Sequence, residues 1–211
     1  MNTQAKPSHL LLRPWHRLAT ASLAACALMV AACSNDPAPT EEPPLAGASI
    51  GGEFELVGPD GETVRWADFD GQCRVVYFGY AFCPDICPTD VQRMTQGLKV
   101  LGENEPQMAA SITPIFITID PDRDTREIVD EFTNAFSDDL IGLTGTPEQV
   151  RAAADAFKVY YERGETTGDG SYLMNHSNIV YLFDKDGQPL ATLPVDEGPE
   201  AVAAEIQKWV S

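Results

Sequence analysis

Short apolar runs separated by longer amphipathic stretches form the main pattern of the chain. Residues 75–80, 115–119 and 179–183 are rich in β-branched and aromatic residues, and they are apolar on both alternating faces. Strands that are covered on both sides have this pattern, whereas a half-exposed strand alternates apolar and polar residues. The three runs therefore predict interior strands of one covered sheet.

Between the first two runs, the apolar positions change to a helical spacing. A helix is predicted over residues 88–101, with an inward stripe of Val91, Met94, Leu98 and Leu101. Pro88 has no backbone N–H to donate, so it fits the first helical position, with Cys87 directly before the helix. Cys83 then lies on the loop that enters this helix.

Three more helices and a hairpin are predicted further along the chain. A helix over residues 125–136 is opened by Asp124 and Glu127 at capping-box spacing, and a helix over residues 147–157 starts with proline. The last strand leads through "DKDG" into residues 189–193, which predicts a hairpin. A closing helix follows, whose inward residues are Val202, Ile206, Trp209 and Val210.

The order of strand, helix, strand, hairpin and closing helix predicts an α/β, thioredoxin-like fold. Residues 124–162 add an inserted helix-strand-helix segment to this order. Residues 54–57 and 63–66 predict an N-terminal β-hairpin that extends one side of the sheet. Residues 50–211 are enough for one domain with a real core.

The topology brings four chemically active residues to one edge of the predicted sheet. The helical crossover makes the first two strands parallel, and in this fold the third strand runs opposite to them. Ligands of open α/β sheets bind beyond the carboxyl ends of the parallel strands. We therefore expect Cys83, Cys87, Asp120 and His176 to meet at this edge.

The first 32 residues have the pattern of an export signal. Apolar residues 18–32 follow three basic residues, with no acidic residue before them; the basic residues are Lys6, Arg13 and Arg17. The apolar stretch has 15 residues. A membrane-spanning helix needs about 20, so a permanent span is the weaker interpretation.

The end of this signal resembles a bacterial lipobox, "VAAC", which predicts lipidation of Cys33. "LAAC", ending at Cys26, fits the same letters, and a soluble periplasmic protein or an uncleaved anchor is the alternative. Residues 33–49 contain the lipidated cysteine and a stretch rich in proline, small and acidic residues, which predicts a disordered tether. We therefore expect a protein on the periplasmic side of the bacterial cell envelope, held to a membrane by lipid.

The chain is strongly acidic once the signal is set aside. The signal contains three of the 14 basic residues and none of the 32 acidic ones, so the remaining chain has 11 basic residues and a formal charge of −21. This charge argues against nucleic acid as a partner and against electrostatic adhesion to anionic lipid.

The five cysteines have different expected fates. Cys26 leaves with the signal and Cys33 carries the lipid, so Cys73, Cys83 and Cys87 stay in the domain. An odd number of cysteines argues against a domain held together by disulfides. Cys73 begins an apolar run, and a small buried hydrophobic residue is its expected role.

Cys83 and Cys87 are expected to be chemically active. A helix N-terminus carries partial positive charge, which favours the thiolate of Cys87 over its thiol. Two cysteines separated by four positions in a turn can form a disulfide or share a metal ion. The spacing alone does not decide between these uses.

His176 favours the metal, because it is the only histidine left after export. Two thiolates and one imidazole suit copper, above all Cu(I), which accepts few ligands. A structural zinc site needs a fourth ligand, which Asp85 or Asp120 would have to supply.

Three stretches together resemble the Sco/SenC family. They are "YFGYAFCPDICPTD" (77–90), "ITIDPDRDT" (117–125) and "NHSNIVYLFDKDG" (175–187), and the resemblance extends over residues 51–210. Members of that family are membrane-anchored, thioredoxin-fold copper metallochaperones that help to assemble the binuclear copper centre of cytochrome c oxidase. The resemblance implies that Cys83, Cys87 and His176 bind copper, as Cu(I) or Cu(II). It implies that Asp120 supports the site or contacts a partner rather than binding the metal.

Two functions are compatible with these residues. The first is delivery of copper to the copper-site subunit of cytochrome c oxidase or to another copper chaperone, which oxidation of the two thiols would switch off. The second is enzymatic, a thiol-disulfide oxidoreductase that reduces the cysteines of the oxidase copper site or of other exported proteins. In this reaction Cys83 attacks and Cys87 resolves. Ordinary thioredoxins have two residues between their cysteines and this chain has three, and the second function has no use for His176.

Overall fold

The computed structural model describes residues 41–168 and 170–210. Residues 42–211 form one compact unit. Its strands are β1 (Glu55–Val57), β2 (Thr63–Arg65), β3 (Cys73–Gly79), β4 (Ile112–Thr118), β5 (Ile141–Leu143), β6 (Tyr161–Arg163), β7 (Met174–His176), β8 (Val180–Phe183) and β9 (Pro189–Thr192). Its α-helices are α2 (Ile86–Asn104), α3 (Pro106–Ala109), α4 (Arg126–Asn134), α5 (Pro147–Ala156) and α6 (Pro199–Trp209), and two 3₁₀ helices cover Trp66–Phe69 and Val195–Glu197.

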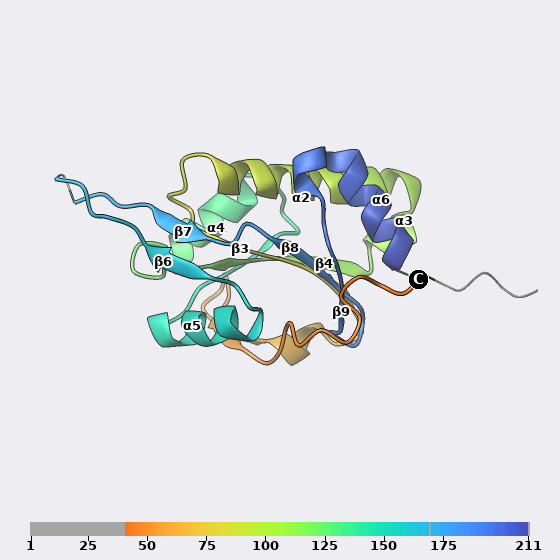
Figure 1. Cartoon of the computed structure of the whole chain (residues 1–211), viewed down its shortest axis with the longest axis horizontal. Helices are drawn as coiled ribbons and strands as arrows, with labels where there is room; N and C mark the ends of the chain where they lie inside the picture. The colour runs from red at the N-terminus through yellow and green to blue at the C-terminus, as the bar shows by residue number, and fades with distance from the viewer. Residues whose placement is uncertain (1–40, 169, 211) are drawn as a thin grey trace, which may run out of the picture. The chain divides into compact units, whose positions relative to one another are not determined.

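A five-stranded sheet in the order β5-β4-β3-β8-β9 forms the centre of the unit. Strand β3 is parallel to β4, and β4 is parallel to β5, whereas β8 runs antiparallel to both β3 and β9. Figure 1 shows α2, α4 and α6 on one face of this sheet and α5 on the other. The predicted thioredoxin-like α/β fold and its inserted segment, α4-β5-α5, are confirmed.

Burial on both faces explains the composition of the central strands. All seven residues of β3 and all seven of β4 are buried. On one face, the ring of Phe116 packs 5.0 Å from that of Phe132 in α4, and on the other face Phe78 packs 5.3 Å from Phe157 after α5. Apolar side chains on both faces of a strand remove it from water and stabilise the sheet.

Two helix starts differ from the prediction. Helix α2 begins at Ile86 after Asp85, so Pro88 lies third in the helix and Cys87 lies inside the first turn. The first-turn N–H groups have no partner within a helix, which is why proline is tolerated at its third position as well. Helix α4 is capped by Thr125, whose hydroxyl accepts from the N–H of Ile128, and not by Asp124, which is buried.

The N-terminal hairpin forms, but it does not extend the central sheet. Strands β1 and β2 make a separate two-stranded sheet. A single bridge joins Val57 to Thr144, just after β5. Before the hairpin, Leu45 donates its N–H to the carbonyl oxygen of Leu190 and packs against the core, so part of the segment with tether composition belongs to the compact unit.

The structure also contains a hairpin that the sequence pattern does not predict. Strands β6 and β7 pair antiparallel as a third small sheet, and Figure 1 shows them extending from one end of the molecule. We refer to residues 161–176 as the arm. At the outer end of the arm, the last paired residues are Arg163 and Met174. At the base of the arm, His176 pairs with Tyr161.

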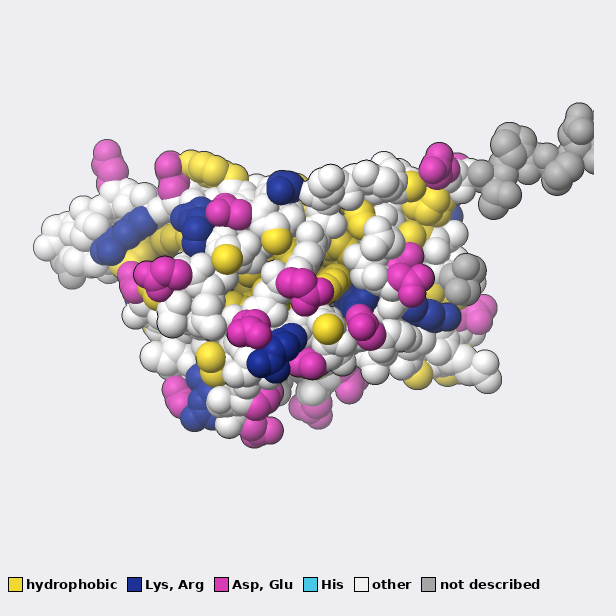
Figure 2. Space-filling model, turned by 90° about the horizontal axis from the view of Figure 1, so that it is seen from below, with side chains coloured by type: hydrophobic (Ala, Val, Ile, Leu, Met, Phe, Trp, Pro, Cys, Tyr) yellow, Lys and Arg dark blue, Asp and Glu magenta, His cyan; other side chains and the backbone are white. Residues whose placement is uncertain are grey.

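The export signal over residues 1–32 and Cys33 lie outside the described residues. Among the helices of the described part, none is both long and apolar enough to cross a bilayer. Figure 2 shows acidic side chains spread over the face that carries α5, with Lys and Arg side chains among them.

Candidate metal centre

The loop from β3 to α2 positions the first cysteine. Its turn is closed by the N–H of Cys83, which donates to the carbonyl oxygen of Tyr80 at 3.2 Å. The N–H of Ala81 donates to the carboxyl oxygen Oδ2 of Asp124 at 2.9 Å. Two hydrogen bonds therefore fix the loop just before the sulfur of Cys83.

Cys87 lies in the first turn of α2, above the end of β3. Its backbone N–H donates to the sulfur of Cys83 at 3.4 Å. Gly79 permits this approach, because a Cβ atom at that position would lie 3.3 Å from the sulfur of Cys87 and only 2.8 Å from the ring of Tyr77. The glycine thus leaves space for the buried thiol against the strand.

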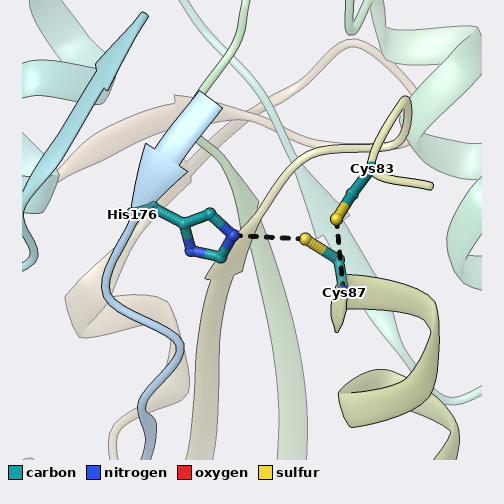
Figure 3. A group of neighbouring side chains, drawn as sticks. All are labelled: Cys83, Cys87 and His176. Atoms are coloured by element: carbon teal, nitrogen blue, oxygen red, sulfur yellow. Dashed lines mark hydrogen bonds between the residues drawn. The ribbon is translucent and has the colours of Figure 1, made fainter. Parts of the chain in front are cut away.

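His176 reaches the cysteines from the base of the arm. Figure 3 shows its imidazole ring pointing at the sulfur of Cys87, and Nε2 lies 3.4 Å from that Sγ atom. Nδ1 lies 2.9 Å from the carbonyl oxygen of Ser177. A carbonyl can only accept, so Nδ1 carries a proton, and in the neutral ring the lone pair of Nε2 is directed at the sulfur.

The three side chains form a possible set of metal ligands. The two Sγ atoms and the imidazole nitrogen all lie within 4.8 Å of one another. Sulfur and imidazole ligands bind transition metals at about 2.0–2.3 Å, so three ligand atoms at these separations can surround one ion. All three cysteines in the described part of the chain are free thiols.

Two tyrosines form the wall behind the imidazole. The rings of Tyr77 and Tyr80 meet the His176 ring edge to face, with centroids 6.3 and 5.9 Å away. The hydroxyl of Tyr77 donates to Asp90 at 3.2 Å. Burial raises the pKa of Tyr80 to about 12, so the hydroxyl of Tyr80 stays protonated in the physiological range.

The electrostatics of the two cysteines are unequal. A hydrogen bond from the thiol of Cys87 lowers the pKa of Cys83 to about 3, with further support from His176 and from backbone N–H groups. The hydrogen bond to Cys83 and burial both raise the pKa of Cys87. The pair therefore loses its first proton easily and holds the second one, and the thiolate resides on Cys83.

This distribution of charge reverses the prediction that the helix N-terminus favours the thiolate of Cys87. Because α2 starts two residues earlier than predicted, Cys87 belongs to the first turn, and its N–H points at the sulfur of Cys83. The helix N-terminus therefore stabilises negative charge on Cys83.

Asp120 does not belong to the cluster of possible metal ligands. It is 4% exposed, and its carboxylate binds Nε of Arg123 at 2.5 Å and the hydroxyl of Tyr172 at 2.8 Å. Asp85 directly precedes α2, without a side-chain capping bond, and also lies outside the cluster.

Sequence reasoning missed Asp124, Arg123 and Tyr172, which contact the elements that carry the ligands. The only sequence signal for the first two was their place in "ITIDPDRDT", directly after a buried strand. No local signal indicates Tyr172, because its partners lie about 50 positions earlier in the chain.

Cys73 lies at the opposite end of β3 from the cysteine pair. Cys73 lies six positions before Gly79 at the other end of the strand, which at about 3.3 Å per residue is roughly 20 Å. Burial raises the pKa of its thiol. Cys73 is a buried apolar residue, as predicted, and it cannot form a disulfide with Cys83 or Cys87 while the domain is folded.

The thioredoxin-like fold and the cluster of two thiols and one imidazole place the chain in a class of thiol-containing metal-binding proteins. The SCO1/SenC family model matches residues 42–211 of the chain. Protein SenC of Rhodobacter capsulatus is 40% identical over 161 residues, which cover 76% of this chain and 71% of SenC. The chain therefore belongs to the SCO1/SenC family.

Solved structures show the same fold. Bradyrhizobium japonicum ScoI with copper bound is similar at a TM-score of 0.68 and 32% sequence identity, over 76% of this chain and 99% of ScoI. BsSco is similar in fold at a TM-score of 0.59 and 20% identity, over 80% of this chain and 97% of BsSco. BsSco is described as a member of the Sco family of cytochrome c oxidase assembly proteins with a disulfide switch.

Proposed function

We propose that the protein binds one copper ion through Cys83, Cys87 and His176 and delivers it during assembly of the copper centre of cytochrome c oxidase. The copper ion is the cargo of this reaction. The acceptor is the oxidase subunit that carries the copper site, or another copper chaperone.

The observation that carries this proposal is the convergence of the three ligand atoms within 4.8 Å. They come from a loop, a helix and the separate arm, and His176 lies 89 positions after Cys87. A structural disulfide would need no imidazole, whereas a soft metal ion gains a third ligand from it. The hydrogen bond from Nδ1 to Ser177 holds the ring in the tautomer that a metal needs.

The choice of copper rests on ligand chemistry and on family membership. Thiolates are soft ligands that favour Cu(I), and three ligands satisfy Cu(I) but leave zinc one short of its usual four. The similar ScoI protein has been solved with copper bound. Asp85 and Asp120, the two carboxylates that the sequence offered as a fourth ligand, stand outside the cluster.

Transfer would proceed by exchange of ligands. Cys87 is fully buried and Cys83 is 9% exposed, so an acceptor reaches the ion from the side of Cys83 and His176. An acceptor thiolate would add to the three-coordinate ion, and the ligands of this chain would then leave one at a time. Ligand exchange of this kind needs no net oxidation or reduction.

Oxidation of the thiol pair would stop copper binding. The thiolate of Cys83 and the thiol of Cys87 would together give two electrons to an oxidant and release one proton, and a bond would form between the two sulfurs. This bond removes the two thiolate ligands. In an oxidising compartment, delivery therefore depends on a reductant that returns the pair to its thiol form.

The proposed location is the periplasmic side of a bacterial membrane. In this proposal residues 1–32 are removed and Cys33 carries the lipid. Residues 33–41 would link the lipid to the folded unit, which starts at residue 42. Two or more acyl chains hold a protein stably on a bilayer, so this anchor would keep the copper carrier near a membrane-bound oxidase.

Copper titration tests the proposal directly. The reduced protein should bind one Cu(I) per chain in competition with a Cu(I) chelator. His176→Ala should weaken binding by more than about 100-fold, because that is the upper range for residues that merely support a metal ligand. Equal affinity of the variant and the wild type would contradict the three-ligand site. Oxidase activity of a deletion strain, with and without added copper, then tests delivery.

A second candidate function is thiol-disulfide exchange, and the sulfur of Cys83 favours it. This sulfur is the more exposed of the pair and accepts a helix N–H, and its lowered pKa of about 3 makes it a thiolate. It would attack one sulfur of a partner disulfide and release the other as a thiolate. Cys87 would then attack Cys83, so the partner gains two electrons and the pair becomes a disulfide.

The same histidine variant separates the two functions. His176→Ala should leave the exchange of the thiol pair with a small disulfide nearly unchanged, because the imidazole is neither nucleophile nor leaving group in that reaction. If His176→Ala instead keeps its copper affinity and loses thiol-disulfide exchange, the result would favour the second function over the first.

A further inference from the structure

The position of His176 depends on how the arm is held. Strands β6 and β7 hydrogen-bond to each other and belong to none of the other sheets of the described chain. The two cysteines, in contrast, are fixed by the central sheet and α2. At its base the arm is joined to the body through the chain, since β8 begins four positions after His176. Beyond this connection, side-chain contacts between the arm and the body hold the arm in place.

One guanidinium joins the loop after β4 to the arm through two contacts. Arg123 donates from Nη1 to the carbonyl oxygen of Tyr172 at 3.0 Å, and its Cζ lies 3.6 Å from the centroid of the Tyr172 ring. Its Nε binds Asp120, and the hydroxyl of Tyr172 donates to the other oxygen of the same carboxylate. Asp120, Arg123 and Tyr172 thus all contact one another, and Tyr172 lies four positions before His176 in the arm.

The same guanidinium also faces the loop that carries Cys83. Its Cζ lies 5.1 Å from the ring centroid of Phe82 and 5.7 Å from that of Tyr80. Phe82 immediately precedes Cys83, and the Tyr80 ring forms the wall behind the imidazole of His176. Arg123 therefore lies between the loop that carries Cys83 and the arm that carries His176.

We infer that Arg123, together with Asp120 and Tyr172, is a positioning unit that sets the imidazole of His176 at ligand distance from Cys83 and Cys87. This inference rests on the proposed copper site and adds to it the residues that assemble its third ligand. Arg123 binds no metal in this account. It acts through the arm, and without it the site would keep its two sulfurs while the nitrogen is displaced.

The chemistry of the contacts requires arginine at this position. A planar guanidinium can bind a carboxylate and a carbonyl along its edge while its face stacks on an aromatic ring, and an ammonium group cannot do all three. Tyr172 is buried and also contacts a second guanidinium, that of Arg163, 3.6 Å from its ring. The ring of Tyr172 is therefore held on the arm and against the body by cationic partners.

A double-mutant cycle tests whether Arg123 acts through His176. In the reduced protein, Arg123→Gln should weaken Cu(I) binding by about tenfold, the lower range for residues that orient a metal ligand. In the His176→Ala background the same substitution should change the affinity by less than about twofold, because the ligand that it positions is gone. Equal losses in both backgrounds, or no loss in either, would overturn the inference.

Arg126→Gln is the matched control. Arg126 lies three positions further on and bonds to Pro59 and Glu127, away from the arm. It should leave Cu(I) affinity unchanged in both backgrounds. Tyr172→Phe is the milder variant, because it keeps the ring and removes the bond to Asp120; it should give a smaller loss than Arg123→Gln and the same dependence on His176.

A metal-free measurement separates failure of this inference from failure of the proposed function. In the reduced apo protein, nuclear Overhauser effects between the imidazole of His176 and the ring of Tyr80 should be present in the wild type and Arg126→Gln, and lost in Arg123→Gln. Retention of these effects in Arg123→Gln would overturn the positioning role. If they are lost while wild type and His176→Ala bind Cu(I) equally, the positioning role stands and the copper proposal fails.

Discussion

At the scale of single residues, the two cysteines of one motif have opposite environments. Cys83 accepts a backbone N–H from the first turn of α2, whereas Cys87 is fully buried beneath the helix. The asymmetry gives the pair one thiolate and one thiol. A soft metal ion entering the site would therefore need to displace only one proton, that of Cys87.

Alkylation should reveal this asymmetry. In the reduced, metal-free protein, the rate at which Cys83 reacts with iodoacetamide should stay nearly constant from pH 8 to about 5 and fall only as the pH approaches its pKa of about 3. An ordinary thiol, with a pKa near 8.5, loses about tenfold in rate per pH unit below that value. Mass spectrometry of the modified peptides gives the rate at each cysteine.

Unfolding in urea provides the control for this experiment. All three cysteines of the domain should then share the steep pH dependence of an ordinary thiol. A folded protein in which Cys83 and Cys87 lose reactivity together below pH 8 would show that neither sulfur is held as a thiolate.

At the scale of elements, the sequence predicts the strands and helices that have a regular apolar pattern. It does not predict the very short strands of the arm or features that depend on tertiary contacts. Strands β3, β4 and β8 follow from apolar runs, and their directions follow from the crossover rule, which is why the convergence of Cys83, Cys87 and His176 was predictable. Strands β6 and β7 have only three residues each, "YER" and "MNH", and neither is apolar enough to give a strand signal.

The misassigned helix cap has a tertiary cause. Asp124 has the residue type and spacing of a cap, but its carboxylate turns inward to bind Ala81 and Thr118, and its carbonyl accepts from Thr144. Thr125 caps the helix instead. Such a choice depends on segments that are distant in the sequence, so local spacing cannot reveal it.

The buried Asp124 should make stability depend on pH. Burial raises its pKa to about 6 in the folded protein, above the unfolded value of about 3.9. The protonated form is thus favoured by folding, and this stabilising contribution is complete below about pH 4 and lost as the pH rises through about 6. At about 1.4 kcal/mol per pKa unit, the loss is on the order of 3 kcal/mol.

Asp124→Asn should remove this part of the pH dependence. The amide oxygen can still accept from Ala81 and Thr118, and the side chain no longer ionises. Urea unfolding of the reduced, metal-free protein between pH 4 and 7 should give a flatter curve of unfolding free energy for Asp124→Asn than for the wild type. Asp138→Asn removes an exposed carboxylate and should keep the wild-type slope; equal slopes for all three proteins would contradict the account.

At the scale of the whole molecule, the described chain begins at the end opposite the candidate metal centre. Leu45 bonds to Leu190, next to the pair of Phe183 and Pro189, and Phe183 in turn pairs with Arg74 near the start of β3. The cysteine loop follows the other end of β3, and Figure 1 shows the arm on that side. The candidate metal centre and Leu45 therefore lie at opposite ends of β3.

The most direct test of the central claim is X-ray absorption at the copper edge of the reduced protein loaded with one equivalent of Cu(I). The account predicts two sulfur neighbours and one nitrogen neighbour in the wild type, and loss of the nitrogen alone in His176→Ala. Spectra that fit two sulfur neighbours in both proteins would contradict a three-ligand site built from Cys83, Cys87 and His176.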